Sequence, residues 1–251
     1  MTFKDHFSGH AAAYAEARPT YPAALFEWLA SLAPARSLAW DAGCGSGQAA
    51  LALAAHFDAV LATDPSAAQV ANAPQHPRVR YAVEPAEASS AAAGCVDLVS
   101  VAQAYHWFDA ARFHAEVRRV TKPGAAVAVY GYDLMRISPA IDATVAALYD
   151  GVLGPYWPPE RALVDAHYAG VAFPYEELPW PAFSMRHDWT LAQVLAYLAT
   201  WSAVQRCRTA TGADPLHATG AAIAREWGDP AATRTVEWPL FGRAGRVVAA
   251  S

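Results

Sequence analysis

The chain has 251 residues, of which 55% are apolar and 16% are charged, and its formal net charge is −5. This length is sufficient for one large domain with a hydrophobic core, and the composition excludes a disordered chain. The negative charge provides no attraction to nucleic acid or to an anionic membrane surface.

The N-terminal part, residues 1–36, has an aromatic and charged lead, and its pattern predicts a helix over Pro22–Leu32. From Ser37 to Tyr132, apolar strand-like runs alternate with helical patterns. We expect strands at Ser37–Ala42, Ala59–Thr63, Arg78–Val83, Val96–Ala102 and Ala125–Tyr130, and helices at Ser46–His56, directly after Asp64-Pro65-Ser66, and at about Asp109–Val120. This alternation predicts an α/β fold with a doubly wound, mostly parallel sheet, whose ligands bind at the carboxyl ends of the strands.

The pattern becomes less regular after Asp133. Helices are predicted at Pro139–Gly151, Trp189–Trp201 and Pro215–Trp227, around a segment, 154–181, that is rich in proline and aromatic residues. Thr233–Val248 predicts a last strand or hairpin, although Pro239 and two glycines interrupt it. Without an internal repeat or a flexible linker, we expect a single domain over 1–251. Its parts are an N-terminal lid segment (1–36), a ligand-binding core (37–132), an inserted helical cap (133–232) and a C-terminal strand region (233–251).

A glycine-rich turn follows the first predicted strand. It reads Asp41-Ala42-Gly43-Cys44-Gly45-Ser46-Gly47-Gln48, and glycines at a strand-to-helix turn let a ligand approach the backbone. Asp64 ends the second strand about 20 residues after Gly45, the spacing of an acid that binds ribose hydroxyls. A tight turn without a ligand, and a helix cap at Asp64 or Ser66, are the structural alternatives.

Asp41 distinguishes two possible ligands of this turn. A carboxylate just before the first glycine would repel the pyrophosphate of a dinucleotide, and Gln48 replaces the third glycine of the G-x-G-x-x-G pattern. S-adenosylmethionine carries an ammonium and a sulfonium group and no phosphate, so an acid suits its methionine end. The turn therefore favours this methyl donor over NAD.

The segment from Asp41 to Gly47 resembles the first motif of class I methyltransferases, and Asp64 resembles their ribose-binding acid. Further similarity lies in Val83–Glu87, in Val96–Gln103 and in Val117–Gly124, so that the resemblance covers about 37–130. It implies a Rossmann-like methyltransferase fold, expected with seven strands, and S-adenosyl-L-methionine as the cofactor. The expected donor-binding residues are Tyr14, Arg18, Asp41, Gly43, Cys44, Gly45, Gln48, Asp64, Pro65, Ala86, Glu87 and Gln103.

The flanking segments are similar to a narrower group, the small-molecule methyltransferases related to trans-aconitate methyltransferase. The residues that carry this similarity are Phe7, Tyr14, Arg18-Pro19, Tyr21-Pro22, Gln103–Asp109, Leu198–Ser202 and Trp238–Leu240. The resemblance implies a small-molecule acceptor. No nucleic-acid partner is expected, because the net charge is negative and the loop Gln103–Phe108 lacks the Asp/Asn-Pro-Pro-aromatic pattern of amino-methylating nucleic-acid enzymes, and no membrane partner is expected. Residues expected to line the acceptor pocket are Tyr21, Trp107, Tyr132, Trp157, Trp201 and Arg206.

Methyl transfer from such a donor is a direct displacement, so the protein mainly aligns the reactants. A carboxylate acceptor needs no base, whereas a hydroxyl, thiol or amine acceptor needs one in some cases, and His106 is the candidate. A hydrogen-bonded wall residue is the alternative role for His106. Tyr14 and Arg18 are candidates to close over the methionine end, with Arg18 pairing its carboxylate.

The sequence disfavours a metal or disulfide protein and a membrane protein, and it leaves two alternative functions open. Cys44, Cys95 and Cys207 lie far apart, without the spacing of a zinc site or a disulfide framework. No signal peptide and no apolar run of ~18 residues is apparent, so a cytoplasmic protein without a metal is expected. The alternatives are a non-catalytic protein that binds S-adenosylmethionine or S-adenosylhomocysteine and, less favoured, an NAD-dependent oxidoreductase.

Overall fold

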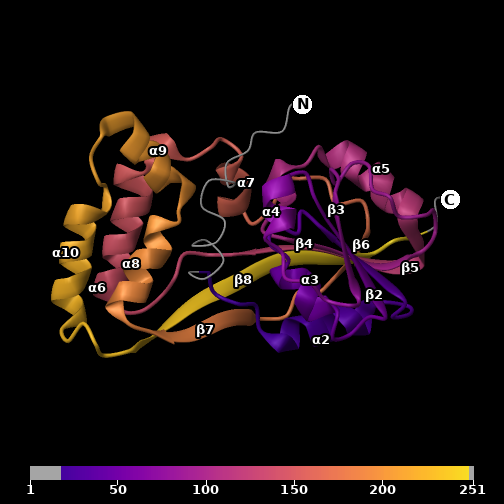
Figure 1. Cartoon of the computed structure of the whole chain (residues 1–251), viewed down its shortest axis with the longest axis horizontal. Helices are drawn as coiled ribbons and strands as arrows, with labels where there is room; N and C mark the ends of the chain where they lie inside the picture. The colour runs from indigo at the N-terminus through magenta and orange to yellow at the C-terminus, as the bar shows by residue number, and fades with distance from the viewer. Residues whose placement is uncertain (1–17, 249–251) are drawn as a thin grey trace.

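The computed structural model of the chain describes residues 18–248, and a mixed sheet of eight strands forms its centre (Figure 1). The strand order is β3-β2-β1-β4-β5-β8-β6, and β7 pairs with β8 outside this path. Strands β1 to β5 are parallel, and β8 is antiparallel to β5, β6 and β7. The strands are β1 Leu38–Ala42, β2 Ala59–Asp64, β3 Val79–Val83, β4 Val96–Ala102, β5 Thr121–Tyr132, β6 Glu176–Leu178, β7 Phe183–Trp189 and β8 Arg234–Arg246.

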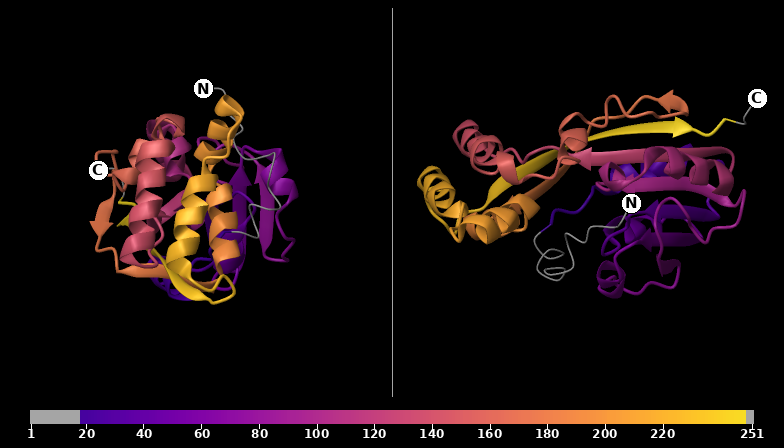
Figure 2. Two further views of the ribbon diagram at one scale, coloured as in Figure 1. Left: turned by 90° about the vertical axis from the view of Figure 1, so that its left-hand side faces the viewer. Right: turned by 90° about the horizontal axis from the view of Figure 1, so that it is seen from above.

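The helices form two groups. Beside the parallel strands lie α2 Ala23–Leu32, α3 Gln48–Leu53, α4 Ala67–Ala71, the short η2 Tyr105–Trp107 and α5 Ala110–Val120. The second group follows β5 in the chain and contains α6 Pro139–Ala146, its continuation η3 Ala147–Val152, η4 Gly154–Tyr156, α7 Arg161–Asp165, α8 Leu191–Ala199, α9 Ser202–Thr211 and α10 Leu216–Trp227. Of these, α7 packs in the same buried layer as α5. Helices α6, α8, α9 and α10 extend beyond one end of the sheet (Figure 2). The doubly wound fold with a helical cap is therefore confirmed, with eight strands in place of seven.

The apolar runs of the central strands form two buried layers, one on each face of the sheet. In β5, Ala126, Ala128 and Tyr130 join the layer that contains α2 and α3, whereas Val127 and Val129 join the layer that contains α5. Successive side chains of a strand point to opposite faces, so a strand covered on both sides must be apolar throughout. This is why the predicted runs matched β1, β2 and β4 closely. The run Ala125–Tyr130 marked only the buried middle of β5, which begins four residues earlier and ends two residues later.

The pairing of the last strand, β8, explains why this strand tolerates a proline. Its N-terminal half pairs with β7 up to Leu240, and its C-terminal half pairs with β5 from Leu240 onward. Pro239 lies at this change of partner, where its carbonyl accepts a hydrogen bond from Asp133 N at 3.0 Å. Gly242 is required because a Cβ there would lie 2.6 Å from the Trp180 ring. Pro239 and Gly242 therefore interrupt the sequence pattern but not the strand, which continues through both residues.

The cap differs in detail from the sequence expectation. The predicted helix Trp189–Trp201 is wrong at its start, because Phe183–Trp189 is strand β7 and the helix begins after Thr190. Thr190 N donates to Gln193 Oε1 at 2.9 Å, which satisfies a free amide at the helix start. Strand β6 and helix α9 were not predicted. No helix within residues 18–248 has the length and apolar character to cross a membrane.

Candidate functional site

The glycine-rich turn is fixed to the end of strand β2. The amides of Gly43 and Cys44 donate to Thr63 O at 2.8 and 2.9 Å. Asp64 then accepts from Gly45 N at 2.9 Å through Oδ2 and from Ser66 N at 2.8 Å through Oδ1. Of the two predicted caps, Ser66 is the one that caps α4. Asp64 therefore orients the turn at the carboxyl edge of the sheet, where this fold binds ligands.

The turn brings its backbone close to neighbouring side chains. Gly43, Gly45 and Gly47 all have positive φ angles, which residues other than glycine rarely adopt. At Gly47 a Cβ would also lie 2.4 Å from the hydroxyl oxygen of Tyr81. The turn therefore requires glycine for its backbone conformation and, at Gly47, also because a side chain would overlap Tyr81.

Asp41 is the unusual charged group beneath this turn. Its side chain is fully buried, and neither carboxylate oxygen has a hydrogen-bond partner within residues 18–248. Burial, and then the nearby charge of Asp64, raise the pKa of Asp41 to about 7, while the Ala50 amide acts in the opposite direction. The hydroxyl of Tyr81 and the Oε1 atom of Gln69 are also buried without a partner there. Buried polar groups are nearly always hydrogen-bonded, so these unpaired oxygen atoms suit a cationic ligand that donates hydrogen bonds to them.

Other predicted donor-binding residues support the turn from its sides. Gln48 Nε2 donates to Pro19 O at 3.1 Å, which fixes the lead segment to the start of α3. Glu87 Oε1 accepts from Asp109 N at 2.8 Å beside the start of α5. Three more expected donor-site positions are Cys44 and Ala86, which are buried, and Pro65, which is half-buried directly after Asp64. Tyr14 lies outside the described residues.

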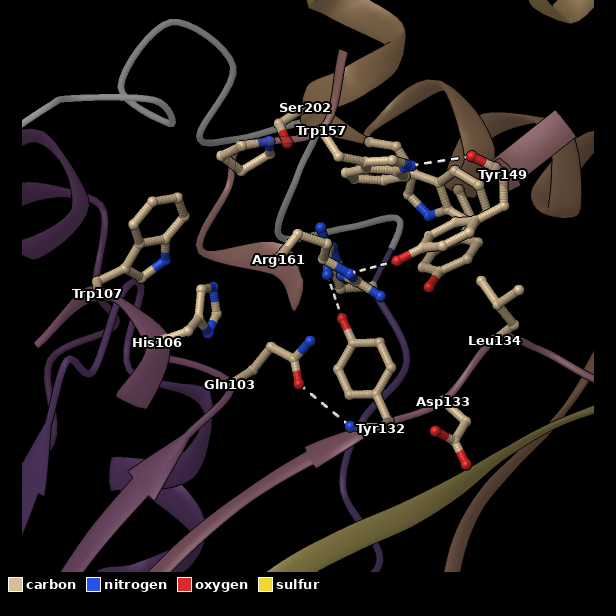
Figure 3. A pocket seen from close by; sticks show the side chains of 14 residues that line it. Gln103, His106, Trp107, Tyr132, Asp133, Leu134, Tyr149, Trp157, Arg161 and Ser202 are labelled. Carbon is tan, nitrogen blue, oxygen red and sulfur yellow. Dashed lines mark hydrogen bonds between the residues drawn. The ribbon is translucent and has the colours of Figure 1, made fainter. Parts of the chain in front are cut away.

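A cavity of about 70 Å³ opens between the segment that follows β4 and the cap (Figure 3). Gln103 forms one side and adopts a left-handed backbone with φ 54°. The backbone amide of Gln103 donates to Tyr130 O at 2.7 Å, and its side-chain Oε1 accepts from Tyr132 N at 3.1 Å. These bonds hold a non-glycine residue in a strained conformation, a feature that concentrates at functional sites.

His106 lies beside this cavity and is nearly buried. Its Nδ1 is 3.4 Å from the hydroxyl oxygen of Tyr168. Burial, and then the charge of Arg161, lower the pKa of His106 to about 3. The imidazole is therefore neutral at physiological pH and a weak proton acceptor, which favours the role of a wall residue over that of a general base.

The cavity gathers four of the six residues predicted to line it: Trp107, Tyr132, Trp157 and Trp201. The other two lie elsewhere. Tyr21 packs edge-on against Tyr130, with ring centroids 5.4 Å apart, and Arg206 Nη1 donates to Tyr156 O at 3.4 Å. The predicted donor-binding residue Arg18 also lines the cavity, where it donates to the hydroxyl of Tyr132.

Sequence reasoning missed several cavity residues, notably Tyr149, Arg161 and Tyr197. Arg161 begins the five-residue helix α7 inside the proline-rich segment, which carries no motif and no regular period. Prolines around a lone arginine were the only local signal. Tyr132, Tyr149 and Arg161 also border an adjoining cavity of about 250 Å³.

Comparison with known proteins gives concordant results. The profile of a family described as a methyltransferase domain matches residues 40–129. A Dictyostelium discoideum protein named as a methyltransferase is 33% identical over 80% of this chain and 78% of its own length. A Mycobacterium tuberculosis protein named as an uncharacterized methyltransferase is 36% identical over 47% of this chain and 48% of its own. A structure described as a type II methyltransferase from Anaeromyxobacter dehalogenans is 48% identical, with a TM-score of 0.87, over 93% of this chain and 99% of that one.

Proposed function

This chain belongs to the class I methyltransferases, and from that premise we propose that it transfers a methyl group from S-adenosylmethionine to a small molecule. The cofactor supplies a methyl group on a positively charged sulfur, so that an acceptor can displace it directly. No covalent intermediate with the protein is needed. The contribution of the chain is to bind both partners, align them and exclude water.

The observation that carries this proposal is the buried, unpaired carboxylate of Asp41 beneath the glycine-rich turn. An uncompensated buried charge is costly unless a ligand of opposite charge approaches it. The ammonium and sulfonium groups of S-adenosylmethionine provide that charge, whereas the pyrophosphate of NAD would be repelled. In this proposal the carboxylate of Asp64, at the end of β2, accepts hydrogen bonds from the ribose hydroxyls.

The acceptor would occupy the cavity between Gln103 and the cap. Its lining is rich in tryptophan and tyrosine side chains, which supply apolar area with a few polar atoms, as is common in small-molecule sites. Because His106 is a weak base, the site suits an acceptor that is already an anion or that loses its proton to water. This favours a carboxylate over an unactivated hydroxyl.

Calorimetric titration of the purified chain tests the donor site. S-adenosylmethionine and S-adenosylhomocysteine are expected to bind with micromolar affinity, and NAD is expected not to bind. Binding of NAD alone would overturn the assignment of Asp41. A chain that binds both donor forms but yields no S-adenosylhomocysteine with any acceptor would support the alternative of a non-catalytic binding protein.

A further inference from the structure

One guanidinium in the cavity wall, that of Arg161, is held flat by aromatic rings. Its Cζ atom lies 5.2 Å from the centroid of the Tyr149 ring and 5.1 Å from that of the Trp157 ring. Such contacts fix the plane of an arginine and partly replace its hydration. Only 20% of its side chain is exposed, so a charged group is held in a largely dry wall.

The hydrogen bonds of Arg161 leave its outer edge available. Its Nε donates to the Tyr149 hydroxyl at 2.6 Å and to Asp165 Oδ1 at 3.2 Å. The Tyr149 hydroxyl donates in turn to the same Asp165 oxygen at 2.6 Å. Within residues 18–248 neither terminal nitrogen makes a hydrogen bond, and neither is enclosed by protein. The two ring contacts and the hydrogen bonds of Nε therefore hold both terminal nitrogens, Nη1 and Nη2, in a fixed orientation at the cavity wall, where Figure 3 labels Arg161.

The charges around the cavity favour an anion. Arg18 contributes a second cation to the lining. Of the nearby acids, Asp133 is bridged to His167 at 2.7 Å, and Asp165 is engaged by Arg161 and Tyr149. Counted as formal charges, the lining of the 70 Å³ cavity holds two arginines and one acid, Asp133, and is therefore positive, although the chain as a whole carries a charge of −5. The other two acids nearby, Asp150 and Asp165, border the adjoining cavity. Two parallel N–H donors match the two oxygens of a carboxylate.

We propose that Arg161 binds a carboxylate of the methyl acceptor, so that the acceptors are small organic carboxylates. Their apolar part would lie against Trp157 and Trp201, which line the same cavity. The acids Asp133 and Asp165 nearby oppose a doubly charged phosphate more than a singly charged carboxylate. The inference rests on the proposed function for the identity of the site, but anion binding can be measured without turnover.

The test uses three carboxylates, benzoate, phenylacetate and indole-3-acetate, each compared with its amide, and phenyl phosphate. They are titrated into the full chain with and without saturating S-adenosylhomocysteine. We expect at least one carboxylate to bind at least tenfold more tightly than its amide. Arg161→Gln should lose at least tenfold in carboxylate affinity and keep its amide affinity. Arg208→Gln is the matched control, because Arg208 lies on α9, pairs with Asp214 and does not line the cavity.

Arg161→Lys provides a second variant in case Arg161→Gln does not fold. It keeps the charge but not the planar fork, so its carboxylate affinity should fall between those of the other two proteins. Equal binding of every carboxylate and its amide, tighter binding of phenyl phosphate, or wild-type carboxylate affinity in a folded Arg161 variant would overturn the inference. Binding of S-adenosylhomocysteine is read separately, so a failed anion site leaves the donor site intact.

Discussion

Replacing Asp41 by Asn is expected to stabilise the free protein at pH 8. Burial and Asp64 raise the pKa of Asp41 from 3.8 to about 7. Such a carboxyl is protonated in both states below pH 3.8, and it destabilises the fold progressively as the pH rises towards 7. At roughly 1.4 kcal/mol per pKa unit, the penalty is about 4 kcal/mol at pH 8 and about 2 kcal/mol at pH 5. Asparagine has nearly the same shape and carries no charge, so it avoids the penalty.

Thermal unfolding of the free protein at several pH values measures this effect. For a chain of this size, about 4 kcal/mol corresponds to an increase of roughly 8–16 °C in the midpoint at pH 8, and the increase should be smaller at pH 5. Asp58→Asn is the matched control, since Asp58 is exposed just before β2. An unchanged or lower midpoint for Asp41→Asn at pH 8 would refute the description of Asp41 as an uncompensated buried charge.

The same variant tests the role of Asp41 in binding. If the carboxylate attracts the ammonium of the donor, S-adenosylhomocysteine should bind roughly 10- to 100-fold more weakly to Asp41→Asn at pH 8. Binding to the wild type should strengthen as the pH rises through 7, because the ligand then meets a charged carboxylate. A variant with greater stability and undiminished affinity would contradict the placement of the methionine end over Asp41.

Three further outcomes are expected. Gly47→Ala should weaken S-adenosylhomocysteine binding in calorimetry and lower the unfolding midpoint more than Gly94→Ala, because both have positive φ but only Gly47 faces a tyrosine ring; equal effects would show that crowding is unimportant. His106→Asn should keep methyl transfer within about tenfold of wild type. It should also remove the part of the acid destabilisation that develops below pH 6.5 as the unfolded chain takes up a proton, about 2 kcal/mol at pH 5 by urea unfolding; loss of turnover by ~10²-fold or more would restore the general base. Gly242→Val should destabilise the fold by roughly 1–3 kcal/mol through overlap with Trp180, and an unchanged urea midpoint would disprove this close contact.

The core was predictable because its signals are local. Strands buried on both faces require continuous apolar runs, and the turn from Asp41 to Gly47 requires glycine and acid at fixed positions. Strand β7 carried a usable signal that was overlooked. Met185 is buried whereas Arg186 and Asp188 are exposed, the alternation of a half-buried strand. The predicted helix was extended to the tryptophans at 189 and 201, so it started two residues before α8 and included the last residue of β7.

The acceptor side could not be derived in the same way. Arg161 gains its surroundings from Tyr149 and Trp157 only after the cap has folded, and no spacing in the sequence marks this arrangement. The two arginines that the sequence did single out, Arg18 and Arg206, differ in outcome, since Arg18 lines the cavity and Arg206 turns to the Tyr156 carbonyl. Tertiary packing, which local patterns do not encode, decides which cations face a ligand.

Strand β8 has a consequence for engineering this protein. Residues before Pro239 pair with β7 and those after it pair with β5, so one uninterrupted strand belongs to both the cap and the core (Figure 1). An exchange of caps between relatives would therefore need to carry β7 and the first half of β8 together, with the splice near Pro239. A junction within either half would divide a hydrogen-bonded ladder, and we expect such chimaeras to fail in folding before their acceptor preference can be measured.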